Sequence, residues 1–190
     1  MKLARPDIRH PRIVLVGSEG GDDAGLVAAL RKRGLHARWL SWDDPDTLQA
    51  DLVILRTTTD YADRLDEFLA WTRRVPNLLN APEVIAWSSS QGNLRSTASG
   101  SHTALIFLGG SQSHAFDAAA AVRIQADAEL WAVGRTALRA AADQLNIGTD
   151  ELLYARVDVA GGPGKAKLAR LDLVAPPLGW ALLDDAARDD

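Results

Sequence analysis

The segment Asp51–Asn80, DLVILRTTTDYADRLDEFLAWTRRVPNLLN, combines a strand pattern, a polar turn and a helix pattern in one continuous stretch. A short apolar run, Leu52–Leu55, ends at Arg56 and a threonine-rich turn, and the apolar side chains after the turn follow helical spacing. We expect Asp60 to be the N-cap of that helix. Ligands of open α/β sheets bind at the carboxyl ends of the strands, so the turn is where we expect a site.

The composition is that of a globular protein and excludes several classes of function. The chain has 190 residues, of which 47% are apolar, and a net charge of −4, so no basic surface for nucleic acid is expected. It has no cysteine, which excludes disulfides, thiolate metal sites and a cysteine nucleophile. We see no secretory signal at the N-terminus and no run of about 18 apolar residues, so we expect a cytoplasmic protein without a membrane segment.

The first part of the chain has the pattern of a parallel α/β lobe. A strand is expected at Ile13–Val16, a helix at Leu26–Arg33 and a second strand at His36–Ser41, and Leu52–Leu55 continues the series. The turn Gly17–Gly25 is rich in glycine, but its spacing is not GxGxxG and its acidic residues would repel a phosphate, so we interpret it as a tight turn.

A short strand at Leu78–Leu79 and a helix at Ala81–Trp87 follow, with Pro82 at the first helical position. The stretch Ser88–Ser101 is rich in serine and glycine, which is typical of a linker. We therefore expect an α/β lobe over residues 1–87 and a linker over 88–102. A second lobe is expected over 103–180 and an acidic tail over 181–190.

The second lobe has the pattern of an antiparallel sheet with a helix on it. Strands are expected at Thr103–Leu108, Val122–Gln125, Leu152–Val159 and Lys167–Val174. A helix is expected at Glu129–Leu145. The glycine-rich turn at 160–164 predicts that the last two strands form a hairpin. Asp158 and Asp172 have matching parity relative to that turn, so we expect them to share one face of the sheet.

Six strings in this order carry a resemblance to a known family. They are WDDP (42–45), RTTTDY (56–61), DEFLAW (66–71), LLNAPEVIAW (78–87), FLGGSQSHAF (107–116) and LYARVDV (153–159). Together they resemble bacterial ATP-grasp ligases related to the cyclo-ligase of cycloserine biosynthesis. The resemblance implies a Rossmann-like pre-ATP-grasp lobe and a C-terminal ATP-grasp lobe carrying Mg²⁺ ligands. It also implies a central lobe that covers ATP, and joining of a carboxylate to an amine through an acyl-phosphate.

The departures from that family indicate lost chemistry. The central lobe is missing, because the serine-rich linker leads directly into the last lobe. Asp117 and Ala118 stand where the family has basic residues, Arg170 replaces one metal ligand and Ala175 replaces a third acid, leaving Asp172. A guanidinium cannot coordinate Mg²⁺, which needs oxygen ligands, and phosphoryl transfer depends on such charge neutralisation. We therefore expect a catalytically impaired pseudo-ligase without a cofactor, which acts as a binding or interaction module.

Two alternatives remain open. The chain could be a residual ATP-dependent carboxylate–amine ligase or nucleotide-binding enzyme that uses ATP and Mg²⁺ and is completed by a partner. It could also be a sensor of a small carboxylate metabolite.

The resemblance implies ligand contacts around the RTTTDY turn. The candidate ligand-binding residues are Arg56, Thr57, Asp60, Tyr61 and Asn80. The guanidinium of Arg56 can bind a carboxylate in a bidentate manner, and Asp60 can pair with an amine. The structural alternatives are that Asp60 caps a helix and that Arg56 pairs with Asp51 or Asp158.

Asp158 and Asp172 are the candidates for a weak, vestigial metal site. The alternative is that Asp158 forms a structural ion pair with Arg170 or Arg156. The histidines His102 and His114 have no second metal-type residue at suitable spacing. We therefore interpret their side chains as hydrogen-bonded within the fold or as exposed.

The association state is expected to follow from the missing lobe. Removing a central lobe exposes apolar faces, and large exposed patches are seldom tolerated in a monomer. Either the two remaining lobes close on each other or the surface is buried by association, and a homodimer or another protein partner is expected. The six tryptophans are expected mainly in the core or between lobes.

Overall fold

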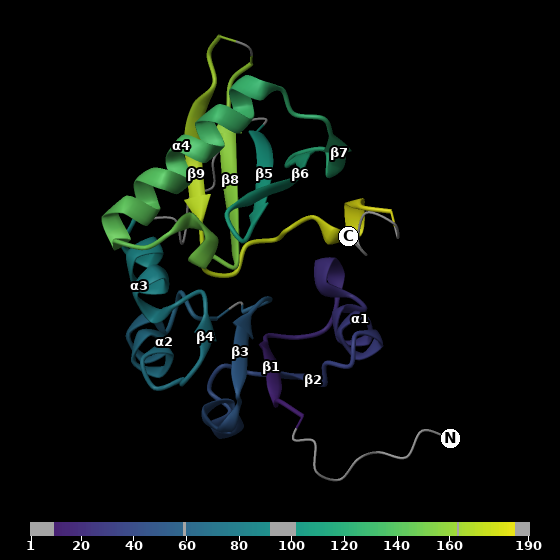
Figure 1. Cartoon of the computed structure of the whole chain (residues 1–190), viewed down its shortest axis with the longest axis vertical. Coiled ribbons are helices and arrows are strands. Elements are labelled where there is room, and N and C mark those ends of the chain that lie inside the picture. The colour runs from purple at the N-terminus through teal and green to yellow at the C-terminus, as the bar shows by residue number, and fades with distance from the viewer. Residues whose placement is uncertain (1–9, 59, 92–101, 163, 185–190) are drawn as a thin grey trace.

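The chain folds around two β-sheets (Figure 1). The computed structural model describes residues 10–58, 60–91, 102–162 and 164–184. One sheet is parallel, with strand order β2-β1-β3-β4, and the other is antiparallel, with order β7-β6-β5-β8-β9. This architecture confirms the predicted fold class of a parallel α/β unit followed by an antiparallel α+β unit.

The strands of the parallel sheet coincide closely with the apolar runs of the sequence. They are β1 (Ile13–Val16), β2 (Ala37–Leu40), β3 (Leu52–Leu55) and β4 (Leu78–Leu79). One face of the sheet packs against α1 (Leu26–Lys32) and the other against α2 (Leu65–Thr72). Since helices cover both faces, β1 is buried along its whole length, which explains its continuous apolar sequence.

Helix α2 begins at Leu65, five residues after the position predicted for its N-cap. Arg64 is at the N-cap, and its side chain makes no capping hydrogen bond. The chain from Asp60 to Arg64 instead forms turns, in which the N–H of Asp63 donates to the carbonyl of Asp60 at 3.1 Å. The prediction that Asp60 caps this helix was wrong.

Helix α3 (Pro82–Ser90) begins with the proline as predicted but continues past Trp87. Ser88 and Ser89 are buried, and the N–H of Leu173 donates to Ser88 Oγ at 3.3 Å. The first three residues of the predicted linker are therefore helical, because they pack against the second sheet. Residues 92–101 of that linker lie outside the described residues.

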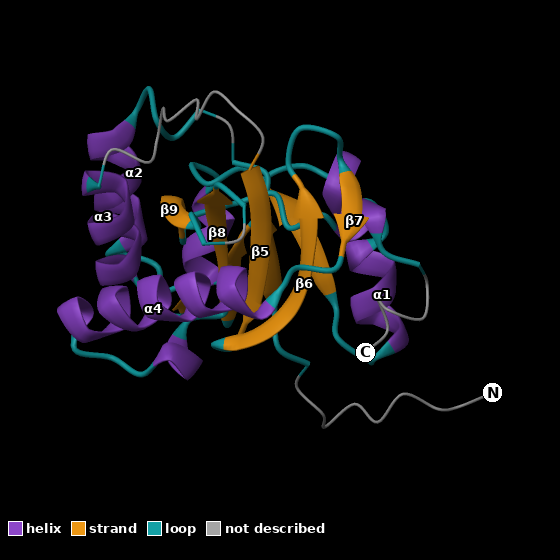
Figure 2. Cartoon of the chain, turned by 90° about the horizontal axis from the view of Figure 1, so that it is seen from above, coloured by secondary structure: helices purple, strands orange, loops and turns teal. Residues whose placement is uncertain are grey.

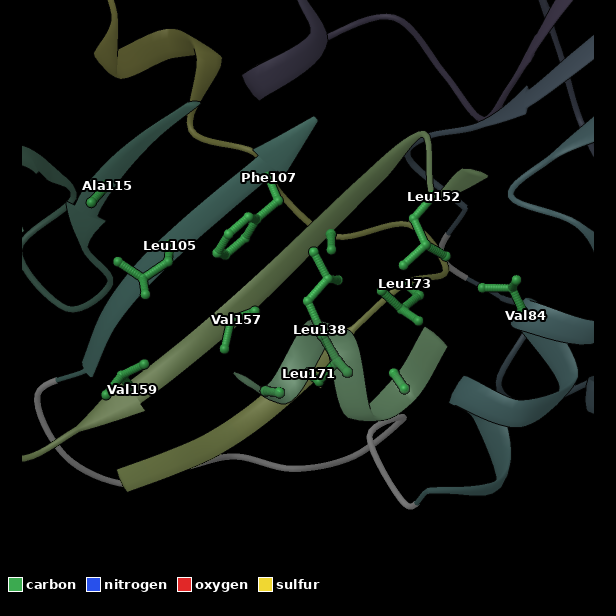
Figure 3. Packing of buried hydrophobic residues seen from close by; sticks show 13 residues of the cluster. Val84, Leu105, Phe107, Ala115, Leu138, Leu152, Val157, Val159, Leu171 and Leu173 are labelled. Atoms are coloured by element: carbon green, nitrogen blue, oxygen red, sulfur yellow. The ribbon is translucent and has the colours of Figure 1, made fainter. Parts of the chain in front are cut away.

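The antiparallel sheet has helix α4 (Ala128–Leu145) across one face (Figure 2). Its strands are β5 (His102–Leu108), β6 (Ser111–Asp117), β7 (Val122–Ile124), β8 (Tyr154–Ala160) and β9 (Lys167–Asp172). Strand β6 was not predicted, because its first residues are polar and exposed. The core beneath α4 is continuous with α3, whose Val84 packs beside Leu152 and Leu173 (Figure 3).

The opposite face of this sheet is covered by the C-terminal segment, which we define as residues 174–184. In Figure 1 it runs, in yellow, from the end of β9 between the two sheets towards α1. Leu178 and Trp180 pack on Ala104, Ile106 and Phe116, and a short 3-10 helix, η5 (Trp180–Leu182), follows. Leu183 is also buried, so the first residues of the predicted tail 181–190 pack against the fold; residues 185–190 lie outside the described residues.

The two sheets close directly on each other. The hydroxyl oxygen of Tyr154 on β8 lies 2.7 Å from the carbonyl oxygens of both Leu55 and Val174, and Val174 belongs to the core of the parallel sheet. Only two large apolar side chains of the described residues are strongly exposed, Val122 and Leu168. Of the described helices, none has the length and apolar character needed to cross a bilayer.

Within the described residues, three further short 3-10 helices lie in the connections. They are η1 (Gly21–Asp23), η2 (Pro45–Gln49) and η4 (Thr149–Glu151).

Candidate functional site

The carboxyl ends of β3 and β4 meet the face of the antiparallel sheet that lies opposite α4, and the predicted site residues lie around this junction. Arg56, directly after β3, is 4% exposed. Its Nε and Nη2 donate to Asp23 Oδ1 at 2.9 and 2.7 Å, and its guanidinium lies 5.4 Å from the centre of the Tyr154 ring. Neither Asp51 nor Asp158 is its partner, so both predicted pairings were wrong. The guanidinium nitrogens expected to bind a ligand's carboxylate therefore bind the carboxylate of Asp23 instead.

The third nitrogen of this guanidinium is in an unusual position. Arg56 Nη1 is buried and has no hydrogen-bond partner among the described residues. A buried N–H group without a partner carries a desolvation cost of about 1–3 kcal/mol, more when it is charged. The atom is therefore a point where a water molecule or an acceptor oxygen of a ligand would be stabilised.

The glycine-rich turn after β1 supplies the two carboxylates that organise the junction. Asp23 pairs with Arg56, and Asp22 accepts hydrogen bonds from the N–H groups of Leu178, Gly179 and Ala181 at 2.7, 2.9 and 3.1 Å. Gly179 has a positive φ of 72°, and a side chain there would collide with the Phe116 ring. The turn is thus an attachment point for the C-terminal segment. Sequence reasoning missed this role, although two adjacent acids in a glycine turn were a visible signal.

Thr57 and Asp60 of the RTTTDY turn have different neighbours. The hydroxyl of Thr57 lies 3.5 Å from Asp23 Oδ2, so it shares the carboxylate that pairs with Arg56. The hydroxyl of Thr57 donates to the carbonyl of Ser18 at 2.8 Å. Asp60 accepts a hydrogen bond from Trp42 Nε1 at 2.9 Å and lies 3.5 Å from Arg64, with about half of its side chain exposed. The structure therefore does not bring Arg56 and Asp60 together as the two ends of one small-ligand site.

Tyr61, the last residue of this turn, packs against the core of the parallel sheet. Its ring packs on Phe68 with 4.9 Å between ring centres. Burial, together with the negative charge of Asp172, raises the pKa of Tyr61 to about 12. The hydroxyl of Tyr61, like that of an ordinary tyrosine, is protonated at neutral pH, and its burial makes the phenolate still harder to form.

Asn80 is fully buried and has a structural arrangement of hydrogen bonds. Its Nδ2 donates to the carbonyls of Leu173 and Tyr154 at 2.8 and 3.1 Å, and its Oδ1 accepts from the N–H of Leu153 at 2.7 Å. All three partners belong to the second sheet or its flanking loops. This side chain therefore joins the two sheets, and its amide is occupied in this structure.

Asp158 and Asp172 lie on one face of the sheet, as predicted from their parity. Asp158 is opposite Arg170 in the β8–β9 register, and Asp172 is opposite Arg156. Asp158 accepts from Arg156 Nε at 2.8 Å, and Asp172 forms an ion pair with Arg170. Both carboxylates are buried. The prediction that Asp158 pairs with one of these two arginines is confirmed, and the partner is Arg156.

This charge cluster, defined as Arg156, Asp158, Arg170 and Asp172, does not fit a magnesium ion. Mg²⁺ requires oxygen ligands in near-octahedral geometry. Each carboxylate here already has an arginine partner, and Asp172 also accepts from the N–H of Val174 at 3.1 Å. Among the described residues, no three histidine, cysteine or acidic side chains are grouped so that they could hold a metal. The cluster is electrically balanced without a cation.

His114 on β6 is a satisfied histidine, as the sequence predicted. Its Nε2 lies 2.6 Å from the carbonyl of Leu178, and its Nδ1 lies 2.9 Å from Ser113 Oγ. Burial lowers the pKa of His114 below its ordinary value, although the contact with Leu178 opposes this. The ring therefore holds the same C-terminal segment that Asp22 holds.

A pH dependence of stability follows from His114. Its pKa is lower in the folded than in the unfolded chain, so below about pH 6.5 the unfolded chain binds a proton that the folded chain does not. The free energy of unfolding should therefore be fully retained above that pH and should fall as the pH is lowered from 7 to 5. Urea titrations at several pH values measure it. His114→Gln should show a smaller fall, whereas His36→Gln, which removes an exposed histidine, should behave like the parent. Equal slopes in all three proteins would contradict the assignment.

Comparisons with known proteins show which folds this chain resembles. Residues 9–80 match the family model of the N-terminal domain of D-cycloserine synthetase DcsG. The solved structure of D-cycloserine synthetase DcsG superposes with a TM-score of 0.74 at 19% sequence identity, over 94% of this chain and 96% of that chain. A comparison with curated proteins found no match.

Two further solved structures extend the similarity to other ATP-grasp enzymes. Macrocyclase MdnB from Microcystis aeruginosa MRC has a TM-score of 0.56 at 10% identity, over 94% of this chain and 96% of that chain. D-alanine–D-alanine ligase from Bacillus anthracis, complexed with ATP, has a TM-score of 0.51 at 13% identity, over 86% of each chain. At such low identities the similarity shows the fold.

Proposed function

Because this chain is a relative of the cycloserine-pathway ATP-grasp ligases, with their N-terminal domain at residues 9–80, we propose that it is a catalytically impaired member that acts as a binding or interaction module. The observation that carries the proposal is the charge cluster. The two acids that resemble the family's metal ligands are each paired with an arginine, so a cation there would have to displace a guanidinium.

The connection between the two sheets also supports the proposal. Only residues 92–101 lie between the last described residue after α3 and the start of β5, which is too short for a lobe that covers a nucleotide. The space between the sheets is instead filled by Tyr154, Asn80 and the C-terminal segment. Phosphoryl transfer requires positively charged groups and metal ions around the phosphates, and the described residues contain no group of three histidine, cysteine or acidic side chains that could hold such a metal.

Nucleotide binding is the test. A ligand at 100 times its Kd stabilises a protein by about 2.7 kcal/mol, which would raise the Tm of a chain of this size by about 5–10 °C. We expect Mg-ATP to raise the Tm by less than about 1 °C, equal to Mg²⁺ alone.

The control variant is Asp172→Asn, which removes the remaining acid that resembles a metal ligand. A Tm increase with Mg-ATP in the parent that is lost in Asp172→Asn would overturn the proposal. Together with release of ADP in the presence of an amino acid, it would support the alternative of a residual ligase completed by a partner.

One observation favours a second candidate, the small-carboxylate sensor. The unpartnered Nη1 of Arg56 would be satisfied by a carboxylate oxygen. Thermal stabilisation by alanine, but not by its amide, would support the sensor, and Arg56→Lys should abolish it because lysine lacks the planar fork. Association into a homodimer also remains a prediction, which sedimentation velocity at micromolar concentration measures.

A further inference from the structure

Two of the strings that the sequence analysis singled out, WDDP and DEFLAW, lie outside the junction described above. They line a groove of about 370 Å³ between η2 and α2, on the α2 side of the parallel sheet. Its lining residues from the first string are Trp42, Asp43, Asp44 and Pro45, followed by Leu48. From α2 and its ends come Arg64, Glu67, Ala70, Trp71 and Arg74.

The two walls of this groove run side by side in the same direction. At one end Arg64 Nη1 donates to Asp43 Oδ2 at 2.8 Å, and further along Trp71 Nε1 donates to Thr47 Oγ1 at 2.9 Å. The start of one wall, at Asp43, therefore lies beside the start of the other, at Arg64, and Thr47 lies beside Trp71 further along. From Arg64 to Arg74 the helical wall extends about 15 Å, at 1.5 Å per residue.

The first end of the groove is negatively charged. Arg64 lies within 4 Å of three carboxylates, those of Asp43, Asp60 and Glu67, so its single positive charge leaves two negative charges uncompensated. The carboxylate of Asp44 adds a further negative charge. It caps η2 by accepting a hydrogen bond from the N–H of Asp46 at 2.8 Å. A cationic group of a ligand is therefore attracted to this end.

The second end of the groove is positively charged. The guanidinium of Arg74 lines it and has no hydrogen-bond or ion-pair partner among the described residues. Between the two ends the lining consists of Pro45, Leu48, Ala70 and Trp71. Trp42 and Trp71 both donate their indole N–H groups to fixed partners, so these aromatic walls are held in place before any ligand arrives.

We propose that this groove binds a short, free-ended peptide of about three residues, a length that spans about 10 Å when extended. Its amino terminus lies at the end formed by Asp43, Asp44 and Glu67, its middle side chain lies on the apolar lining, and its carboxylate pairs with Arg74. The charge separation along the groove selects this occupant over a wholly apolar or singly charged ligand. The site is separate from the charge cluster and does not depend on nucleotide binding.

The test uses the tripeptide Ala-Leu-Ala, its C-terminal amide and its N-acetyl form as probes, followed by the indole N–H signals in ¹⁵N NMR spectra. The free tripeptide should shift the Trp42 and Trp71 signals saturably, with a Kd of the order of millimolar, and should leave the signal of Trp131 on α4 unchanged. Each blocked form should bind about three- to fivefold more weakly, as expected for an exposed charge pair.

Variants assign the two ends. Arg74→Gln should weaken binding of the free tripeptide by the same factor as amidation and should make the protein indifferent to amidation. Arg73→Gln, which removes the neighbouring exposed arginine outside the groove lining, should bind like the parent. Asp44→Asn, which keeps a good cap for η2, should reduce the discrimination against the N-acetyl form. No saturable shift at about 10 mM tripeptide, equal binding of all three probes, or equal effects of the two arginine variants would overturn the proposal.

Discussion

Replacing Arg56 with alanine is expected to lower the free energy of unfolding by about 3–5 kcal/mol. The reason is that Asp23, whose side chain is 1% exposed, would keep a buried negative charge without a partner. The loss should be visible as a lower urea midpoint in equilibrium denaturation followed by tryptophan fluorescence. A protein of this size has about 5–15 kcal/mol of stability in total, so the variant could be largely unfolded at room temperature.

An exposed ion pair of the same type provides the control. Arg12 Nε lies 3.4 Å from Asp51 Oδ2, and its side chain is 57% exposed. Arg12→Ala should therefore cost less than about 1 kcal/mol. If Arg56→Ala cost no more than this control, the Arg56–Asp23 pair would have to be hydrated, and the argument for a buried pair would fail.

The second large effect is expected at Asn80. Asn80→Ala removes the partner of two buried groups, the carbonyls of Tyr154 and Leu173, and of one half-buried group, the N–H of Leu153. Each buried group left without a partner costs about 1–3 kcal/mol, so the variant should lose at least about 2 kcal/mol. Because the bonds join the two sheets, hydrogen exchange should become faster in β8 as well as around β4.

Asn77 is the matched control for this substitution. It lies three residues earlier, is exposed, and its Nδ2 donates to the carbonyl of Asp51 at 3.0 Å within the first sheet. Asn77→Ala should cost less than about 1 kcal/mol and should leave exchange in β8 unchanged. A mild effect of Asn80→Ala would mean that water replaces its amide, which would leave room for the ligand contact that the sequence suggested.

Much of the fold could be predicted from the sequence where burial alone determines the structure. The strands Ile13–Val16 and Leu52–Leu55 have the predicted bounds, because helices cover both faces of a parallel sheet and demand continuous apolar runs. Strand β6 could not be found in this way. Its first three residues are exposed, and pairing with β5 and β7, rather than its own composition, makes it a strand.

The candidate site was predictable only where the relevant residues share one element or hairpin. The common face of Asp158 and Asp172 followed from strand parity. The partner of Arg56 did not, because Asp23 lies 33 residues earlier in a turn whose acids had been interpreted only as repelling phosphate. Asn80 is buried by packing against the second sheet, whose residues lie 73 positions and more later in the chain. The sequence around Asn80 contains no pattern that predicts such a long-range contact.

The attachment of the C-terminal segment to Asp22 has a consequence for synthesis on the ribosome. The carboxylate of Asp22 receives its N–H donors from residues 156–159 positions later, so it stays without them until residues 178–181 have left the exit tunnel. The parallel sheet can assemble early, but the glycine-rich turn after β1 stays in water until residues 178–181 are available. A nascent chain stalled before Leu178 has left the tunnel should therefore be sensitive to proteases at the glycine-rich turn, and a chain stalled well after Ala181 has emerged should have lost that sensitivity.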